Sequence, residues 1–372
     1  MKRRELLRGA KLASKIPMYW AFRRYGRPVL PPLAMSFVVT DKCNSLCKTC
    51  NIGRRYLDDP TVADGELSLD EYATLAKSIG PLEWVTFSGG EPFMRKDFAD
   101  VVVAVAEGTR PRVINVPTNA TLVRATVAGV AAILERLGPT RLVVNVSLDG
   151  VGEDHDEVRG FRGNFASATK TVQELRRLSD PRLVVGVNTV ISRFNADRAG
   201  AIFDYVQGEL RPDSHVVELA QIRPEYHNQG DRIASDPALA RAAIDAFSAR
   251  ARSAERSGVP RWVKAFRAEY YQDVKQELAQ ARGHRCFSAF ATCSLMPHGE
   301  VWSNTQRADV LGNVRDFSLD FRALWQGEGA DAARQRIRSE LCHCETSNVA
   351  YSNALMSPRV LSRVVGRWVL GA

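Results

Sequence analysis

The sequence lacks any apolar run that approaches the roughly 18 residues needed to cross a bilayer. Its first residues also lack the apolar core and small-residue cleavage site of a secretory signal. These two absences predict a cytoplasmic protein, in which the seven cysteines stay reduced. In that compartment metal binding outranks disulfide formation as the use of cysteine.

Acidic residues are nearly absent from the first 30 positions, where nine Lys and Arg stand against Glu5 alone. This segment therefore carries eight of the nine net positive charges, and the remainder offers no basic catalytic face. Nucleic acid is accordingly not the expected partner.

Both ends of the chain combine basic and apolar residues at helical spacing. Residues 1–32 predict a basic amphipathic N-terminal arm, and residues 347–372 a C-terminal helix in which Arg359, Arg363 and Arg367 recur every four positions. Such helices suit peripheral contact with an anionic membrane at its inner face. The alternative is that both helices pack on the rest of the protein.

Between these ends, residues 33–235 alternate β-rich apolar runs with helical stretches. The six runs are 36–39, 84–87, 113–116, 142–146, 183–187 and 216–219. Repeated strand and helix predict the α/β class, with a parallel sheet wound into a partial (β/α)6 TIM-like barrel. Residues 236–283 predict a helical connection, and residues 284–346 a small cysteine-bearing C-terminal domain.

Three cysteines, Cys43, Cys47 and Cys50, directly follow the first predicted strand, at the end where a barrel builds its site. Three thiolates on one short loop can hold three irons of a [4Fe–4S] cube and leave the fourth iron open. A structural zinc ion would require a fourth ligand, and no His lies nearby to supply it.

Further motifs follow the next strands. Gly89, Gly90 and Glu91 come after the second strand, where two glycines permit close backbone approach and a carboxylate can receive an ammonium group. The remaining candidates at strand ends are Asn119, Ser147, Asp149, Arg159 and Asn188. The guanidinium of Arg159 is suited to a carboxylate, whereas Asp149 also fits loop capping and salt bridging.

Together, the CxxxCxxC spacing, the Gly-Gly-Glu segment and the Ser-Leu-Asp-Gly…His-Asp-x-x-Arg-Gly run resemble the radical S-adenosylmethionine (SAM) superfamily over residues 34–225. The resemblance implies an enzyme whose [4Fe–4S] cluster on Cys43, Cys47 and Cys50 cleaves SAM to a 5′-deoxyadenosyl radical, which abstracts hydrogen from a substrate. It also implies a reductant such as flavodoxin or ferredoxin. The SAM contacts it implies are Gly89, Gly90, Glu91, Asn119, Ser147, Asp149, Arg159 and Asn188.

These motifs identify neither the substrate nor a catalytic acid, base or radical-quenching residue. The candidate substrates are a peptide, a sugar or aminocyclitol, and a lipid. Two other functions stay open: a non-enzymatic iron–sulfur electron carrier or redox sensor, which would not need Glu91, Ser147 and Arg159, and an RNA-modifying member of the superfamily, whose basic segment would bind phosphates.

Four cysteines remain, Cys286, Cys293, Cys342 and Cys344, the number that fully ligates a second cluster. A zinc site with the same thiolates is the alternative. The stretch from Cys293 to Trp302 resembles the hairpin that opens the SPASM and twitch extensions of the superfamily, with Asn304 near a position where relatives often have cysteine. The resemblance implies an auxiliary [4Fe–4S] cluster that serves electron transfer.

Overall fold

The structure is a computed structural model that describes residues 3–254, 261–280, 285–341 and 347–370. Six parallel strands form the expected partial barrel in the order β6-β5-β4-β3-β2-β1. Their bounds are Ala34–Val38 for β1, Trp84–Ser88 for β2, Val113–Thr118 for β3, Arg141–Ser147 for β4, Leu183–Ile191 for β5 and Ser214–Leu219 for β6. The α/β fold class is confirmed.

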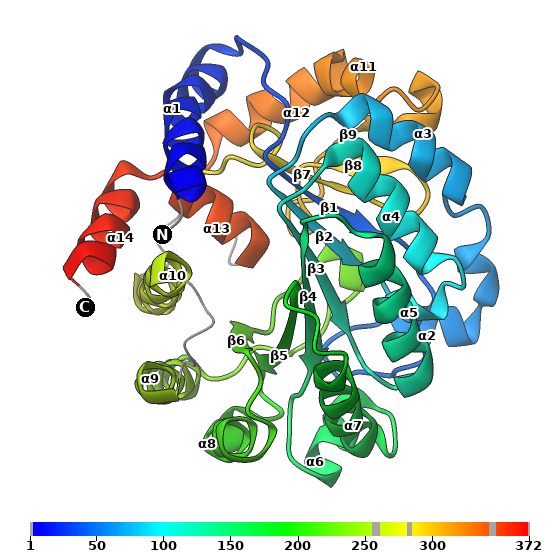
Figure 1. The fold of residues 1–372 in the computed structure, drawn as a ribbon, viewed down its shortest axis with the longest axis vertical. Helices are drawn as coiled ribbons and strands as arrows, with labels where there is room; N and C mark the ends of the chain where they lie inside the picture. The colour runs from blue at the N-terminus through cyan, green and yellow to red at the C-terminus, as the bar shows by residue number, and fades with distance from the viewer. Residues whose placement is uncertain (1–2, 255–260, 281–284, 342–346, 371–372) are drawn as a thin grey trace.

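Helices follow the strands and cover the convex face of the sheet (Figure 1). They are α3 (Leu69–Ile79), α4 (Phe98–Thr109), α5 (Val123–Arg136), α6 (Glu153–Arg159), α7 (Asn164–Arg177) and α8 (Ala199–Tyr205). Local sequence explains their starts: Ser68 and Glu71 form a reciprocal capping box at the beginning of α3. The stretch after β5 divides into a 3-10 turn at Ala196–Arg198, α8 and a π-helical segment at Val206–Leu210.

Strand β4 shows how the sheet separates core from site. Leu142, Val144 and Val146 are fully buried in the main core, while Asn145 and Ser147 alternate with them and are only half-buried. Because side chains alternate across a strand, the second set lies on the opposite, inner face of the sheet. The inner face therefore carries polar groups within the barrel.

The cysteine-bearing C-terminal segment continues the same sheet. Strand β7 (Thr292–Leu295) pairs in parallel with β1, and β8 (Glu300–Trp302) and β9 (Val310–Asn313) follow as antiparallel strands. Helices α11 (Phe321–Gln326) and α12 (Glu328–Ser339) come next. The predicted C-terminal domain at 284–346 thus shares one nine-stranded sheet with the barrel.

Helix α1 (Arg3–Tyr25) packs against the protein instead of forming a free arm. Ile16, Tyr19 and Phe22 are buried in the main core, and Trp20 Nε1 donates to the Met356 carbonyl at 2.8 Å. The helix lies beside α12 and α13 (Ser347–Met356) (Figure 1). The prediction of an N-terminal arm is therefore wrong for residues 16–22, where Tyr19 and Phe22 are core residues.

Three helices outside the barrel complete the fold: α9 (Pro237–Ala254), α10 (Arg261–Gln280) and α14 (Pro358–Leu370). Val360 and Val364 of α14 are buried, and Arg363 and Arg367 lie 2.6 and 2.8 Å from the carboxylate of Glu269 on α10. The C-terminal helix thus packs on the protein. In the part of the chain that the structure describes, no helix is both long and apolar enough to span a membrane.

Candidate functional site

The cysteine loop, residues 39–51, connects β1 to α2 (Ile52–Asp58). Cys43 is buried, and Cys47 and Cys50 are half-buried. Burial raises the pKa of Cys43 to about 12, and nearby Cys47 adds to this rise; burial also raises the pKa of Cys50, again with Cys47 adding to it. Three thiols that oppose one another's ionisation need a cationic partner to become thiolates together, which fits an iron–sulfur cluster.

Gly89 and Gly90 hold this loop by direct backbone contact. The nitrogen of Gly90 donates to the Thr40 carbonyl at 2.7 Å. A Cβ atom on Gly90 would lie 2.1 Å from the Lys42 carbonyl oxygen and 2.9 Å from Cys43 Cβ, and Gly89 has a φ of +140°. The predicted close approach of these glycines is therefore made to the cysteine loop itself.

Glu91 is almost fully buried and joins the ends of β2 and β3. Its Oε1 accepts from Thr118 Oγ1 at 2.8 Å, and its Oε2 accepts from the Asn119 nitrogen at 2.7 Å. Burial raises the pKa of Glu91, while these hydrogen bonds oppose the rise. Oε1 also accepts from the Phe93 nitrogen at 3.2 Å, so three of the about four acceptor positions of this carboxylate are used and one further donor can bind.

Asn119 fixes the middle of the cysteine loop. Its Nδ2 donates to Asn44 Oδ1 and to Ser45 Oγ, both at 2.9 Å, and its own carbonyl accepts from Asn164 Nδ2 at 2.8 Å. The fully buried Asn164 was not anticipated from the sequence. Its only local signal is its place at the start of a helix, a position where Asn is common for capping reasons.

Arg159 and Asp149 form a buried ion pair after β4. Arg159 Nη1 donates to Asp149 Oδ2 at 3.0 Å, and Asp149 Oδ1 accepts from the Val190 nitrogen at 2.7 Å. Arg159 Nε is buried and has no hydrogen-bond partner within the described residues. Burial raises the pKa of Cys47, and Arg159 opposes this rise. Arg159 is thus a cation beside the cysteine loop with an unused donor.

His155 supports this pair as a neutral side chain. Its Nδ1 accepts from the Asp149 nitrogen at 3.0 Å, so the proton sits on Nε2, which lies 3.1 Å from Asn164 Oδ1. Burial lowers the pKa of His155 to about 4. The loop-capping and salt-bridging interpretation of Asp149 agrees with its ion pair to Arg159 and its hydrogen bond from the Val190 nitrogen.

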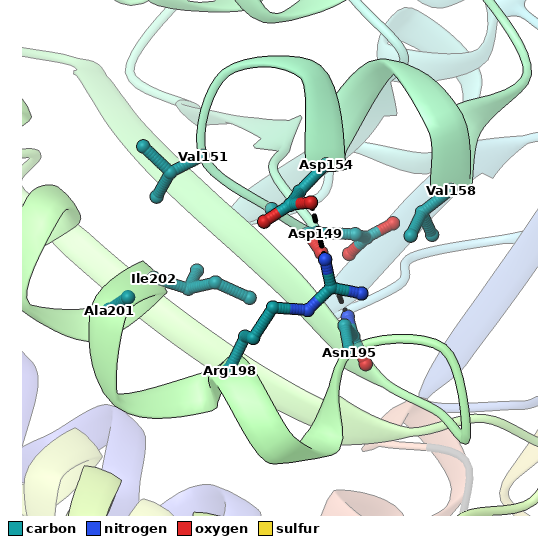
Figure 2. A pocket seen from close by; sticks show the side chains of 9 residues that line it. Asp149, Val151, Asp154, Val158, Asn195, Arg198, Ala201 and Ile202 are labelled. Carbon is teal, nitrogen blue, oxygen red and sulfur yellow. Dashed lines mark hydrogen bonds and ion pairs between the residues drawn. The ribbon is translucent and has the colours of Figure 1, made fainter.

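A cavity of about 50 Å³ is lined by Asp149, Asp154, Asn195 and Arg198 among others. Figure 2 shows Arg198 facing Asp154, with Asn195 beside Asp149. Asn195 Nδ2 donates to the Asp149 carbonyl at 2.9 Å, and Arg198 pairs with Asp154. A space of this size holds water at most. The cavity is therefore too small for a nucleoside ligand.

The inner face of the sheet places Ser147 and Asn188 side by side as register partners on β4 and β5. Asn188 Nδ2 donates to Glu218 Oε2 at 3.2 Å, and Asn145 Nδ2 donates to Asn115 Oδ1 at 2.7 Å. These half-buried amides and the carboxylate form a polar surface near the carboxyl ends of the strands. The structure therefore brings together the predicted residues from five strand ends.

The second cysteine group is only partly described. Cys286 and Cys293 are fully buried, and Cys286 Sγ lies 3.2 Å from Ser288 Oγ, to which Asn304 Nδ2 donates at 2.9 Å. Asn304 is therefore joined to Cys286 through the Ser288 hydroxyl. Cys342 and Cys344 lie outside the described residues, so the four-thiol set stays a prediction.

Among the described residues, no three His, Cys, Asp or Glu side chains converge closely enough to hold a single metal ion. The hairpin between β7 and β8 reaches the cysteine loop, since His298 Nε2 lies 3.3 Å from Asp41 Oδ2 and 3.1 Å from the Val62 carbonyl oxygen. The two cysteine groups are thus linked through one hairpin tip.

This fold and site define the class of the protein. The sequence model of the Radical SAM superfamily matches residues 37–206, which include every predicted site residue from Cys43 to Asn188. This part of the chain, residues 37–206, is a radical SAM domain, as the sequence predicted.

More particular likenesses are to named members. The chain is 26% identical over 263 residues to Fe-coproporphyrin III synthase of Methanosarcina barkeri (strain Fusaro / DSM 804), with 69% of this chain and 60% of that protein covered. It is 26% identical over 323 residues to pre-heme d1 synthase of Dinoroseobacter shibae (strain DSM 16493 / NCIMB 14021 / DFL 12), with 81% and 74% covered. The first match thus spans less than two thirds of its relative.

Among solved structures, Streptococcus suis SuiB bound to S-adenosylmethionine has the same fold, with a TM-score of 0.59 at 16% identity. The superposition covers 90% of this chain and 72% of SuiB. The likeness therefore extends beyond the barrel into the C-terminal part of the chain.

Proposed function

We propose that this chain is a radical SAM enzyme that holds a [4Fe–4S] cluster on Cys43, Cys47 and Cys50 and abstracts hydrogen from a polar substrate. The observation that carries the proposal is the cysteine loop itself. Its three thiols oppose one another's ionisation, and contacts with Gly90 and Asn119 fix its backbone. The buried Arg159 guanidinium lies beside it, with Nε unbonded among the described residues.

When bound, the reduced cluster supplies the electron that cleaves SAM to methionine and a 5′-deoxyadenosyl radical. The chain's own residues position the reactants. Asp149 fixes one edge of the Arg159 guanidinium, which leaves Nε to hold the SAM carboxylate. Glu91, already oriented by Thr118 and Asn119, receives the SAM ammonium group.

The inner face of the barrel favours a substrate with hydroxyl or amide groups. Asn115, Asn145, Ser147, Asn188 and Glu218 offer donors and acceptors there. If the acyl chain of a lipid covered these side chains, their donors and acceptors would lose their hydrogen bonds, which costs binding free energy. Of the three substrate classes, a peptide or a sugar or aminocyclitol therefore fits better than a lipid.

For the second cysteine group we propose the auxiliary [4Fe–4S] cluster that exchanges an electron with the substrate radical. Support comes from the full burial of Cys286 and Cys293 and from the hairpin that links this group to the cysteine loop. The RNA-modifying alternative loses support, because the C-terminal half of α1 is packed in the core.

The test is anaerobic reconstitution with iron and sulfide, followed by dithionite and SAM, with 5′-deoxyadenosine measured by chromatography. The intact chain and a Cys286→Ala control should form it, whereas Cys43→Ala, Cys47→Ala and Cys50→Ala variants should not. If a loaded first cluster leaves SAM intact, alone and with a panel of peptides and aminocyclitols, the electron-carrier or sensor function replaces this proposal.

A further inference from the structure

A cavity of about 600 Å³ lies between the C-terminal end of α1 and the end of α12. Four arginines line it, together with two aromatic side chains: Trp20, Arg23, Arg24, Tyr25, Arg285 and Arg338. Its size is in the range of small-molecule sites. Nothing in the proposed radical chemistry uses it.

The positive charge of this cavity is not compensated by the part of the chain that the structure describes. None of the four arginines forms an ion pair there. Glu340, the acid at the rim, instead binds Arg307 at 2.9 Å. Arg23 donates only to carbonyl oxygens, those of Cys286 at 2.9 Å and Ile337 at 3.5 Å.

Two of these guanidiniums are held inside the fold. Arg23 is 9% exposed, and Arg338 Nε is buried without a hydrogen-bond partner among the described residues. Like charges that repel at close range gain most from an anion placed between them.

The cavity is separate from the cysteine loop. Arg285 precedes β7, and the backbone there joins the start of β1, where the Leu33 nitrogen donates to the Ala291 carbonyl at 2.7 Å. The cysteine loop follows the other end of β1, which has five residues and is therefore about 16 Å long. Cys286 and Cys293 do not line the cavity, so it is not the place of their thiols either.

We propose that this cavity is a second ligand site, which binds a phosphate- or pyrophosphate-bearing molecule. Guanidinium forks pair with phosphate oxygens in two parallel hydrogen bonds, and several forks around one cavity match a group with two or more negative charges. The Trp20 ring, 5.7 Å from Arg285 Cζ, and the largely exposed ring of Tyr25 offer apolar surface to the remainder of the ligand. The source is either a free phosphorylated metabolite or the head group of an acidic phospholipid.

The experiment is calorimetric titration of the cluster-loaded full chain with inorganic pyrophosphate at about 0.15 M salt. An Arg24→Gln, Arg285→Gln double variant removes two cavity charges. An Arg124→Gln, Arg322→Gln double variant removes the same net charge from exposed positions elsewhere and is the matched control. We expect the cavity variant to bind at least about tenfold more weakly, and the control to change by no more than about twofold.

A parallel arm uses sedimentation with vesicles of phosphatidylglycerol against vesicles of phosphatidylcholine. Binding of pyrophosphate assigns a free metabolite, whereas cavity-dependent binding to phosphatidylglycerol vesicles alone assigns a lipid head group. Absence of both, or equal loss in both double variants, overturns the proposal. It is also overturned if the cavity variant loses iron and sulfide with no change in anion binding, because the arginines then serve the second cluster.

Discussion

The Arg159 guanidinium and the Asp149 carboxylate meet at 3.0 Å, and the Asp149 side chain is 2% exposed. The pair joins the end of α6 to the loop after β4, next to the cysteine loop. Removing one partner of such a pair leaves an uncompensated buried charge.

We therefore expect Asp149→Asn to lower the free energy of unfolding by about 3 kcal/mol. Arg159→Lys should retain charge but lose the planar fork, and so raise the KM for SAM by about tenfold with a smaller change in kcat. Thermal unfolding and SAM-cleavage kinetics of the two variants check these outcomes. An unchanged KM in Arg159→Lys would count against a carboxylate contact.

Gly90→Ala should displace the cysteine loop, because the new methyl group would overlap the Lys42 carbonyl oxygen and Cys43 Cβ. The expected result is a loss of most of the iron bound by the first cluster, measured by iron and sulfide content after reconstitution. Gly138→Ala is the control, since nothing lies within 4 Å of its Cβ position. Equal iron content in both variants would show that the loop tolerates the displacement.

Asn119→Ala should remove both hydrogen bonds to Asn44 and Ser45 and cost about 1–3 kcal/mol, because buried polar partners lose their bonds. Turnover with SAM should fall as well, since Asn119 no longer holds the cysteine loop in position. Thr140→Ala is the matched control: it removes one buried hydrogen bond, from Thr140 Oγ1 to the Pro111 carbonyl at 2.7 Å, and leaves the cysteine loop unchanged. Calorimetry and 5′-deoxyadenosine yield together separate the two effects.

His155 makes stability depend on pH. Its folded pKa of about 4 lies below the unfolded value, so the unfolded chain binds the proton first as pH falls below about 6.5. The folded state therefore loses stability from about pH 6.5 down to about pH 4, by roughly 3 kcal/mol at most. Thermal midpoints at about pH 7 and about pH 5 should differ less in His155→Gln than in the native chain.

Glu269→Gln tests the packing of the C-terminal helix. The buried Glu269 carboxylate neutralises Arg363 and Arg367, which are themselves 48% and 35% exposed, so solvent reduces the effect to about 1–2 kcal/mol. A lower thermal midpoint with unchanged SAM cleavage is expected. Glu174→Gln, which breaks an exposed pair with Arg177, should change stability by less than about 0.5 kcal/mol.

Much of the barrel could be predicted from the sequence, because local pattern and chain order determine it. The predicted strand 142–146, for example, corresponds to β4 at Arg141–Ser147. Its β-rich apolar residues predict the strand, and the turn that follows predicts where it ends. The meeting of Glu91, Asn119 and Arg159 near the cysteines followed because parallel strands end at one edge of the sheet.

The remainder depended on tertiary contacts that no local pattern encodes. The pairing of β7 with β1 could not be derived, because an edge strand accepts any strand of suitable register. Nor could the burial of Tyr19 and Phe22, since aromatic residues among basic ones suit a membrane surface and a protein core equally. The partners of Asn119 and Asn164 likewise come from distant segments.

The contacts of α1 have a consequence for the order in which the molecule can form. This helix is synthesised before the segments on which it packs, because Trp20 and Arg23 bond to the carbonyl groups of Met356 and Cys286. Strand β1 likewise lacks one neighbour until Thr292–Leu295 have been made. During synthesis β1 therefore keeps one unpaired edge until β7 has been made, and the contacts of α1 form only after the segments around Cys286 and Met356 have followed.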